Sequence, residues 1–94
     1  IILPTVLEEQ GHVWHLFVLR TNERQQLQEY LTKQNVQTLI HYPIPPHKQK
    51  AYKNLNHLSF PITEKIHEEV ISIPLSSVTT KEEIEKVVNV INKF

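Results

Sequence analysis

Residues 13–19, VWHLFVL, form the first long apolar stretch of the chain. Side chains of a β-strand alternate between its two faces, so Phe17 and Leu19 share one face while Trp14 and Val18 share the other. Both faces are largely apolar, which is typical of a strand that is covered on both sides. We therefore predict a buried strand over these residues.

Two later stretches have apolar positions at helical spacing. Leu27, Tyr30 and Leu31 stand at i, i+3 and i+4, which predicts a helix over residues 23–34. The final segment, residues 80–94, places apolar residues along one side of another helix: Ile84, Val87, Val88, Ile91 and Phe94. Each of these helices can cover a sheet with one side and face solvent with the other.

Polar residues mark the ends of these two helices. Thr80 and Glu83 have the spacing of a capping box, in which each side chain bonds to the backbone of the other residue. Asn22 and Gln25 have the same spacing before the first helix. Asn35 tolerates the left-handed conformation that ends many helices. We therefore expect caps at all three places.

The rest of the pattern predicts two more strands, one more helix and a long loop. VQTLI at 36–40 and VISIP at 70–74 are short and apolar, as strands are. A proline suits the first position of a helix over 61–69. Residues 41–58 have no sustained period and form a loop, with one turn of helix expected near 49–53. The order β, α, β, loop, α, β, α predicts an α/β (α+β) domain of two layers, with about three helices against a small three-stranded sheet.

Composition narrows the class of protein. The 94 residues include ten basic and ten acidic side chains and no cysteine. A neutral chain lacks the positive field that attracts nucleic acid or anionic lipid, and a chain without cysteine suits a reducing cytoplasm. So short a chain forms one domain with a modest core. We therefore expect a cytoplasmic domain that binds neither nucleic acid nor membrane.

The first residue of the chain already belongs to an apolar segment. The chain contains no methionine, and Ile1 opens an apolar segment, IILPTVLEEQ. We therefore expect a piece of a longer protein. The helices of so short a chain cover one face of a sheet, so the strand face that carries Trp14 needs another cover. A missing domain or subunit would supply it.

The densest chemistry lies in HYPIPPHKQ, residues 41–49. Each proline fixes its own φ and restricts the residue before it, so the loop is stiff. His41, Tyr42 and His47 could pack against the sheet edge as structural residues. They could equally project as donors into a cleft where a polar ligand binds. The spacing alone favours neither alternative and specifies no ligand.

Other roles compete for these residues. His41 and His47 flank the prolines and could converge on a metal ion, although no third ligand is evident. Glu64 and His67, three apart on a helix, resemble half of a carboxylate-bridged metal site whose other ligands are not visible. A free-standing interaction domain would use the loop and the Trp14 face to bind a protein. The spacing therefore predicts no complete metal site.

Several motifs resemble one known family in order and spacing: HVWHLFVLR, LIHYPIPPHKQKAY, FPITEKIHEEVISIPLSS and EEIEKVVNVINKF. From His12 to Phe94 the chain resembles the C-terminal segment of the DegT/DnrJ/EryC1/StrS family of nucleotide-sugar aminotransferases. Within that family it is most similar to enzymes that aminate a 3-keto-6-deoxyhexose attached to dTDP.

This resemblance implies a fragment of a fold-type I enzyme that uses pyridoxal 5′-phosphate (PLP). Residues 12–94 would be its small C-terminal domain, and residues 1–11 the remnant of the connection from a missing large domain. In this family the large domain carries the Schiff-base lysine and most groups that bind the cofactor. No catalytic, cofactor-binding or metal-binding residue is therefore expected in this chain.

The resemblance also implies substrates and site residues. Glutamate would donate an amino group to the cofactor, which passes it to a nucleotide-linked keto sugar used for cell-surface polysaccharide, including lipopolysaccharide. His41 and Tyr42, together with His47, would contact the nucleotide-sugar. The full-length protein would be a homodimer, and the fragment alone would be inactive.

Overall fold

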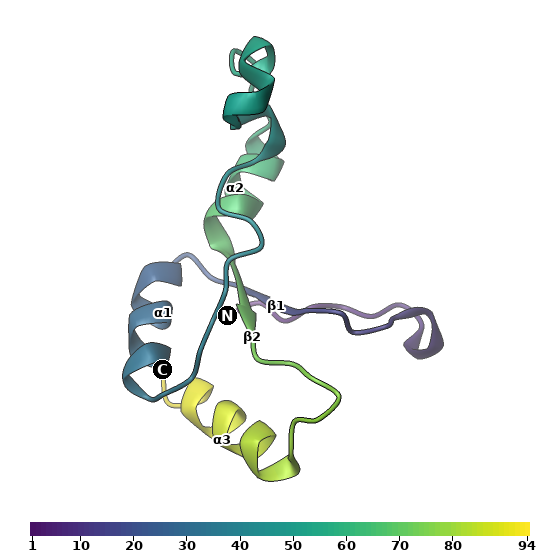
Figure 1. Ribbon diagram of the computed structural model, residues 1–94, viewed down its shortest axis with the longest axis vertical. Helices are drawn as coiled ribbons and strands as arrows, with labels where there is room; N and C mark the ends of the chain where they lie inside the picture. The colour runs from purple at the N-terminus through teal and green to yellow at the C-terminus, as the bar shows by residue number, and fades with distance from the viewer.

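A short antiparallel ladder of two strands lies at the centre of the molecule (Figure 1). In the computed structural model, which describes residues 1–94, β1 (Phe17–Arg20) pairs with β2 (Val70–Ile73). Leu19 lies opposite Ile71 in this register, and both side chains are buried. The ladder therefore joins segments that lie far apart in the sequence.

An isolated β-bridge lies on the outer side of each strand of this ladder. Ile2 pairs with Arg20 beside β1, and Leu39 pairs with Ser72 beside β2 through backbone hydrogen bonds of 3.1 and 2.7 Å. The predicted strand over 36–40 is thus a single bridge. The segment leaves the core at one end and turns into the loop at the other, so only its middle reaches β2. The α/β class is confirmed, whereas the prediction of three strands was wrong.

The first strand is shorter than predicted, because the backbone turns before it. Trp14 has a φ of 48°, in the left-handed region that interrupts an extended strand. Its backbone N–H donates to Nδ1 of His12 at 3.0 Å. Its ring stacks on that of Phe17, with the centroids 5.3 Å apart. Residues 13–16 therefore form an irregular segment that leads into β1.

The α-helices form where the sequence predicts them: α1 (Arg24–Lys33), α2 (Pro61–Glu69) and α3 (Lys81–Ile91). Short 3₁₀ helices add further turns: η1 (Glu9–Gly11), η2 (Pro46–Lys48) and η3 (Lys50–Leu55). The turn of helix expected near 49–53 corresponds to η3. The predicted helices are therefore confirmed.

The helix ends agree with the sequence at two places and differ at a third. Thr80 and Glu83 form the predicted capping box before α3. Asn35 has a φ of 58°, as expected of a residue that ends α1. The predicted cap by Asn22 was wrong, since Glu23 stands at the N-cap of α1 without a side-chain capping bond. A threonine hydroxyl one position before Asn22 accepts the backbone N–H of Glu23 instead.

The hydrophobic core lies on one face of the ladder, between α1 and α3. Its buried centre has these members: Leu19, Leu27, Leu31, Val36 and Ile71. Apolar residues of α3 pack against this centre, and Tyr30 of α1 donates its hydroxyl hydrogen to the backbone oxygen of Val90 in α3 at 3.2 Å. Both helices therefore cover the same face, while α2 points away from them (Figure 1).

Charged side chains connect the end of α2 to β1 and to α1. Glu69, the last residue of α2, is buried, and its Oε2 accepts hydrogen bonds from Nε and Nη2 of Arg20 at 3.1 and 2.7 Å. Arg24 of α1 donates to the backbone oxygen of His67. Because a buried carboxylate is tolerated only when it is paired, these contacts fix the direction in which α2 leaves the sheet.

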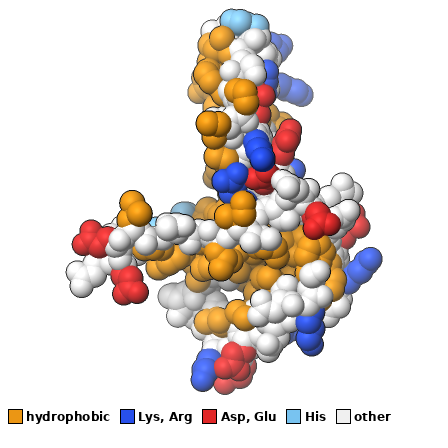
Figure 2. Space-filling model, turned by 180° about the vertical axis from the view of Figure 1, so that it is seen from behind, with side chains coloured by type: hydrophobic (Ala, Val, Ile, Leu, Met, Phe, Trp, Pro, Cys, Tyr) orange, Lys and Arg blue, Asp and Glu red, His pale blue; other side chains and the backbone are white.

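Two projections extend from this centre (Figure 1). Residues 42–69, which include α2, form one of them, called here the loop arm. Residues 3–16 form the other, the N-terminal arm. The radius of gyration is 15.3 Å, compared with about 12.4 Å for a compact chain of this length. Figure 2 shows hydrophobic side chains along both arms, and no helix is long and apolar enough to span a membrane.

Candidate functional site

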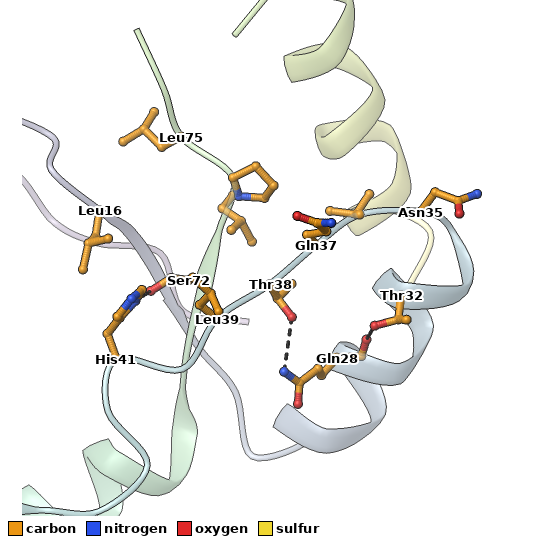
Figure 3. A pocket seen from close by; sticks show the side chains of 13 residues that line it. Leu16, Gln28, Thr32, Asn35, Gln37, Thr38, Leu39, His41, Ser72 and Leu75 are labelled. Carbon is orange, nitrogen blue, oxygen red and sulfur yellow. Dashed lines mark hydrogen bonds between the residues drawn. The ribbon is translucent and has the colours of Figure 1, made fainter. Parts of the chain in front are cut away.

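An open cavity of about 750 Å³ lies between α1, β2 and the segment that connects α1 to the loop arm (Figure 3). Its walls carry amide and hydroxyl groups, among them those of Gln28, Thr38 and Ser72, together with aliphatic side chains such as Leu39. No lysine, arginine or glutamate lines it, and His41 is the one titratable residue in its wall. The cavity therefore offers hydrogen bonds and apolar surface without a fixed charge.

His41 stands at the edge of this cavity, two residues after the Leu39 bridge. Its ring nitrogen Nδ1 lies 2.9 Å from Oγ of Ser72, and the two side chains point toward each other (Figure 3). Ser72 is only 5% exposed. The other ring nitrogen, Nε2, makes no hydrogen bond within the chain. The sheet thus holds one side of the imidazole and leaves the other side available.

Tyr42 follows directly and is the exposed member of the pair. Its ring meets that of His41 edge to face, at 85° and with the centroids 5.4 Å apart. Its backbone oxygen accepts a hydrogen bond from Nδ1 of His67 at 2.6 Å. The residue is 65% exposed, and its hydroxyl has no partner within the chain. Tyr42 therefore has a fixed backbone and a free phenol group.

His47 has a different environment from the other two residues. It is 5% exposed and does not line the cavity. Its Nε2 lies 2.8 Å from Oε1 of Glu64, and its ring is nearly perpendicular to that of Phe60, at 88° and with the centroids 4.9 Å apart. Asn56 donates to its backbone oxygen at 2.7 Å. The structure thus brings His41 and Tyr42 together and places His47 inside the loop arm.

The Glu64 carboxylate is the centre of the polar contacts in this arm. Oε1 accepts the backbone N–H of Phe60 at 3.0 Å and lies 3.8 Å from Nζ of Lys48. The Phe60 N–H and then the His47 ring hold the pKa of Glu64 below its ordinary value, against a smaller opposing effect of burial. Glu64 is therefore a charged group that joins α2 to both sides of the loop.

The sequence had pointed to Glu64 and His67 for another reason. Their spacing, three apart on α2, suggested half of a metal site. In the structure no group of three or more histidines and carboxylates is placed to hold a metal ion. Glu64 instead contacts His47, and His67 contacts the backbone of Tyr42. The spacing does put both side chains on one side of α2, but that side contacts the loop at His47 and Tyr42.

The model of the DegT/DnrJ/EryC1/StrS aminotransferase family matches residues 1–92, so the chain belongs to this family. The resemblance seen in the motifs is thereby confirmed.

Individual relatives make the comparison more specific. The dTDP-3-amino-3,6-dideoxy-alpha-D-galactopyranose transaminase of Aneurinibacillus thermoaerophilus is 59% identical over 98% of this chain and 25% of its own length. The dTDP-3-amino-3,4,6-trideoxy-alpha-D-glucose transaminase of Streptomyces venezuelae is 30% identical over 98% of this chain and 25% of its own length. The chain thus spans about a quarter of the length of these curated relatives.

Solved structures show the same fold. DesV of S. venezuelae, solved in complex with a ketimine intermediate, superposes with a TM-score of 0.90 at 30% identity, over 98% of this chain and 25% of that one. NtdA of Bacillus subtilis, solved with bound cofactor PMP, gives a TM-score of 0.84 at 34% identity, over 98% and 22%. None of these comparisons supports the alternative of a free-standing interaction domain.

The residues of this chain do not by themselves fit PLP. All eight lysines are exposed, and none lines the cavity. The chain has no aspartate that could pair with a pyridine nitrogen, and its single glycine, Gly11, lies in η1. Residues 1–94 thus place no lysine beside the cavity and offer no aspartate for a pyridine nitrogen.

Proposed function

We propose that this chain is a domain of a PLP-dependent aminotransferase that transfers an amino group from glutamate to a keto-deoxysugar linked to dTDP. The observation that carries the proposal is 59% identity, over 98% of the chain, to a transaminase of a dTDP-linked amino sugar. The product would serve the synthesis of cell-surface polysaccharide such as lipopolysaccharide.

The proposal assigns residues 12–94 to the small domain and residues 1–11 to the connection from a large domain. One observation supports the large domain: the chain spans a quarter of the length of its relatives. The large domain would supply the lysine and most contacts to the cofactor. The whole protein would be a cytoplasmic homodimer that uses glutamate and the nucleotide-sugar as substrates.

His41 and Tyr42 are the residues of this chain that we assign to the nucleotide-sugar. Their support is geometric, since Nε2 of His41 and the hydroxyl of Tyr42 have no partner within the chain. The prediction that His47 also contacts the sugar stays a prediction. Its burial and its bond to Glu64 favour a role in holding the loop that presents the other two residues.

The test is made on the full-length protein. Purified with PLP, it should show the visible absorbance of the bound cofactor and should aminate a dTDP-3-keto-6-deoxyhexose with glutamate as donor. His41→Ala and Tyr42→Phe should each lower sugar turnover while the cofactor absorbance stays. A protein without the chromophore, or one that transfers no amino group to such a sugar, would refute the proposed function.

A further inference from the structure

Ser72 is a buried polar residue in the middle of β2, and its hydroxyl has one hydrogen-bond partner in the structure, Nδ1 of His41. Its backbone N–H and C=O are both bonded to Leu39, two residues before His41. Ser72 therefore contacts the chain at two points just before the loop arm, and it holds both the backbone and the ring there.

The hydrogen of the Ser72 hydroxyl decides the state of the His41 ring. A buried donor without an acceptor is costly, so nearly all buried hydroxyl groups find one. Nδ1 of His41 is the acceptor that lies within reach. When Nδ1 accepts, the hydrogen of a neutral imidazole must be on Nε2. His41, which lines the cavity, then carries a free donor N–H at Nε2.

His67 has the opposite arrangement and serves as a reference. Its Nδ1 faces the backbone oxygen of Tyr42, which can only accept. His67 must therefore carry its hydrogen on Nδ1. The carbonyl thus fixes the tautomer of His67, and the Ser72 hydroxyl is placed to favour the opposite tautomer in His41.

We propose that Ser72 is a positioning residue that holds His41 as the Nε2–H tautomer, so that His41 donates a hydrogen bond to an acceptor oxygen of the nucleotide-sugar. Phosphate oxygens and sugar oxygens share this acceptor chemistry. The tautomer follows from the contacts of Ser72 alone, whereas its use in binding rests on the proposed function of His41.

The first test needs no variant other than one for assignment. Full-length protein labelled with ¹⁵N on histidine is measured by solid-state NMR, and a His41→Gln spectrum identifies the His41 signals. Nδ1 of His41 should resonate as an unprotonated nitrogen and its Nε2 as a protonated one, with the reverse for His67. A neutral His41 that is protonated on Nδ1 would overturn the inference.

The second test uses variants of the serine. Ser72→Ala should give a mixture of His41 tautomers and raise the KM for the nucleotide-sugar roughly two- to tenfold, the effect of one neutral hydrogen bond. Ser72→Thr, which keeps the hydroxyl, should restore the single tautomer and the KM. Ser77→Ala is the matched control, because Ser77 is exposed and its side chain has no hydrogen bond in the structure. Equal KM values for Ser72→Ala and Ser77→Ala would contradict the positioning role.

Ligand additions separate the two oxygen sources and the two proposals. A shift of the His41 Nε2 signal with dTDP that inorganic pyrophosphate reproduces assigns the bond to a phosphate oxygen. A shift that appears only with the complete dTDP-sugar assigns it to the sugar. No shift with either overturns the inference. The proposed function still holds in that case if the wild-type protein transfers the amino group, and it fails only if transfer is absent.

Discussion

Asn35 ends α1 in the left-handed region, with a φ of 58°. An L-residue with an ordinary side chain has a steric conflict there between its Cβ and the following carbonyl, which asparagine reduces through local hydrogen bonding and glycine avoids. The backbone N–H of Val36 then donates to the backbone oxygen of Leu31 at 2.9 Å. One residue therefore determines how the chain passes from α1 to the bridge at Leu39.

The first prediction concerns this residue. Asn35→Ala should lower the free energy of unfolding by about 1 kcal/mol, since alanine meets the full left-handed conflict. Asn35→Gly should leave it nearly unchanged. Urea denaturation checks both values. Gln34→Ala is the control, because Gln34 is exposed and has a φ of −91°. An alanine variant at position 35 as stable as this control would show that the turn is not strained.

The loop arm depends on a single carboxylate. Glu64 accepts from Phe60 and contacts His47, and these contacts hold its pKa below the ordinary value. A depressed carboxylate pKa stabilises the folded state fully above the unfolded pKa of glutamate, about 4.3. The contribution then decreases as the pH falls through the lower pKa of the folded state. Acid should therefore loosen this arm before it affects the core.

The second prediction follows from the lowered pKa of Glu64. Hydrogen exchange between residues 42 and 60 should accelerate as the pH falls from 6 to below about 4, beyond the change in intrinsic exchange rate, while exchange in β2 stays slow. Glu64→Gln should exchange rapidly in this arm at pH 6 and respond much less to acid. Glu68→Gln is the matched control on the same helix, because Glu68 is exposed and has no hydrogen bond or ion pair. Equal acid responses of the wild type and Glu64→Gln would contradict the role of the carboxylate.

The third prediction concerns the start of α3. Thr80 Oγ1 accepts the N–H of Glu83 at 3.2 Å, and Oε2 of Glu83 accepts the N–H of Thr80 at 2.8 Å. Thr80→Ala should lower the free energy of unfolding by about 1 kcal/mol, because α3 covers the core and begins with this cap. Ser77→Ala, in the exposed segment before the helix, should change it by less than about 0.5 kcal/mol. Chemical denaturation of both variants distinguishes a cap from a general effect of losing a hydroxyl.

Elements that depend on residues close together in the sequence could be predicted, whereas contacts between residues far apart in the sequence could not. The capping box joins residues three apart, and apolar spacing along α1 and α3 is visible in the sequence, so these features are present as expected. His47 and Glu64 lie 17 residues apart, and His41 and Ser72 lie 31 apart. No periodicity specifies such pairs, because they depend on how the loop folds back on α2 and β2. For the same reason the sequence indicated a loop with donors but not the serine that orients one of them.

The whole molecule exposes more surface than a compact protein of the same mass. Its accessible area is 7487 Å², about 1,800 Å² more than a compact monomer of 11.1 kDa would expose. One partner in a standard protein interface contributes about 800 Å². Apolar residues of the N-terminal arm, such as Leu7 at 99% and Val13 at 88% exposure, account for part of this excess. The shape therefore supports the large domain of our proposal, which would cover exposed area on these arms.

The last prediction compares the 94-residue chain with the full-length protein by hydrogen exchange. The N-terminal arm has few backbone hydrogen bonds of its own, so peptides from residues 3–16 should exchange rapidly in the isolated chain. They should become protected in the full-length protein if a large domain covers them. Peptides from β2 should be protected in both, since they lie in the ladder and the core. Equal and rapid exchange of the arm in both proteins would mean that its apolar side chains face solvent in the complete protein, and the proposed domain contact would then be wrong.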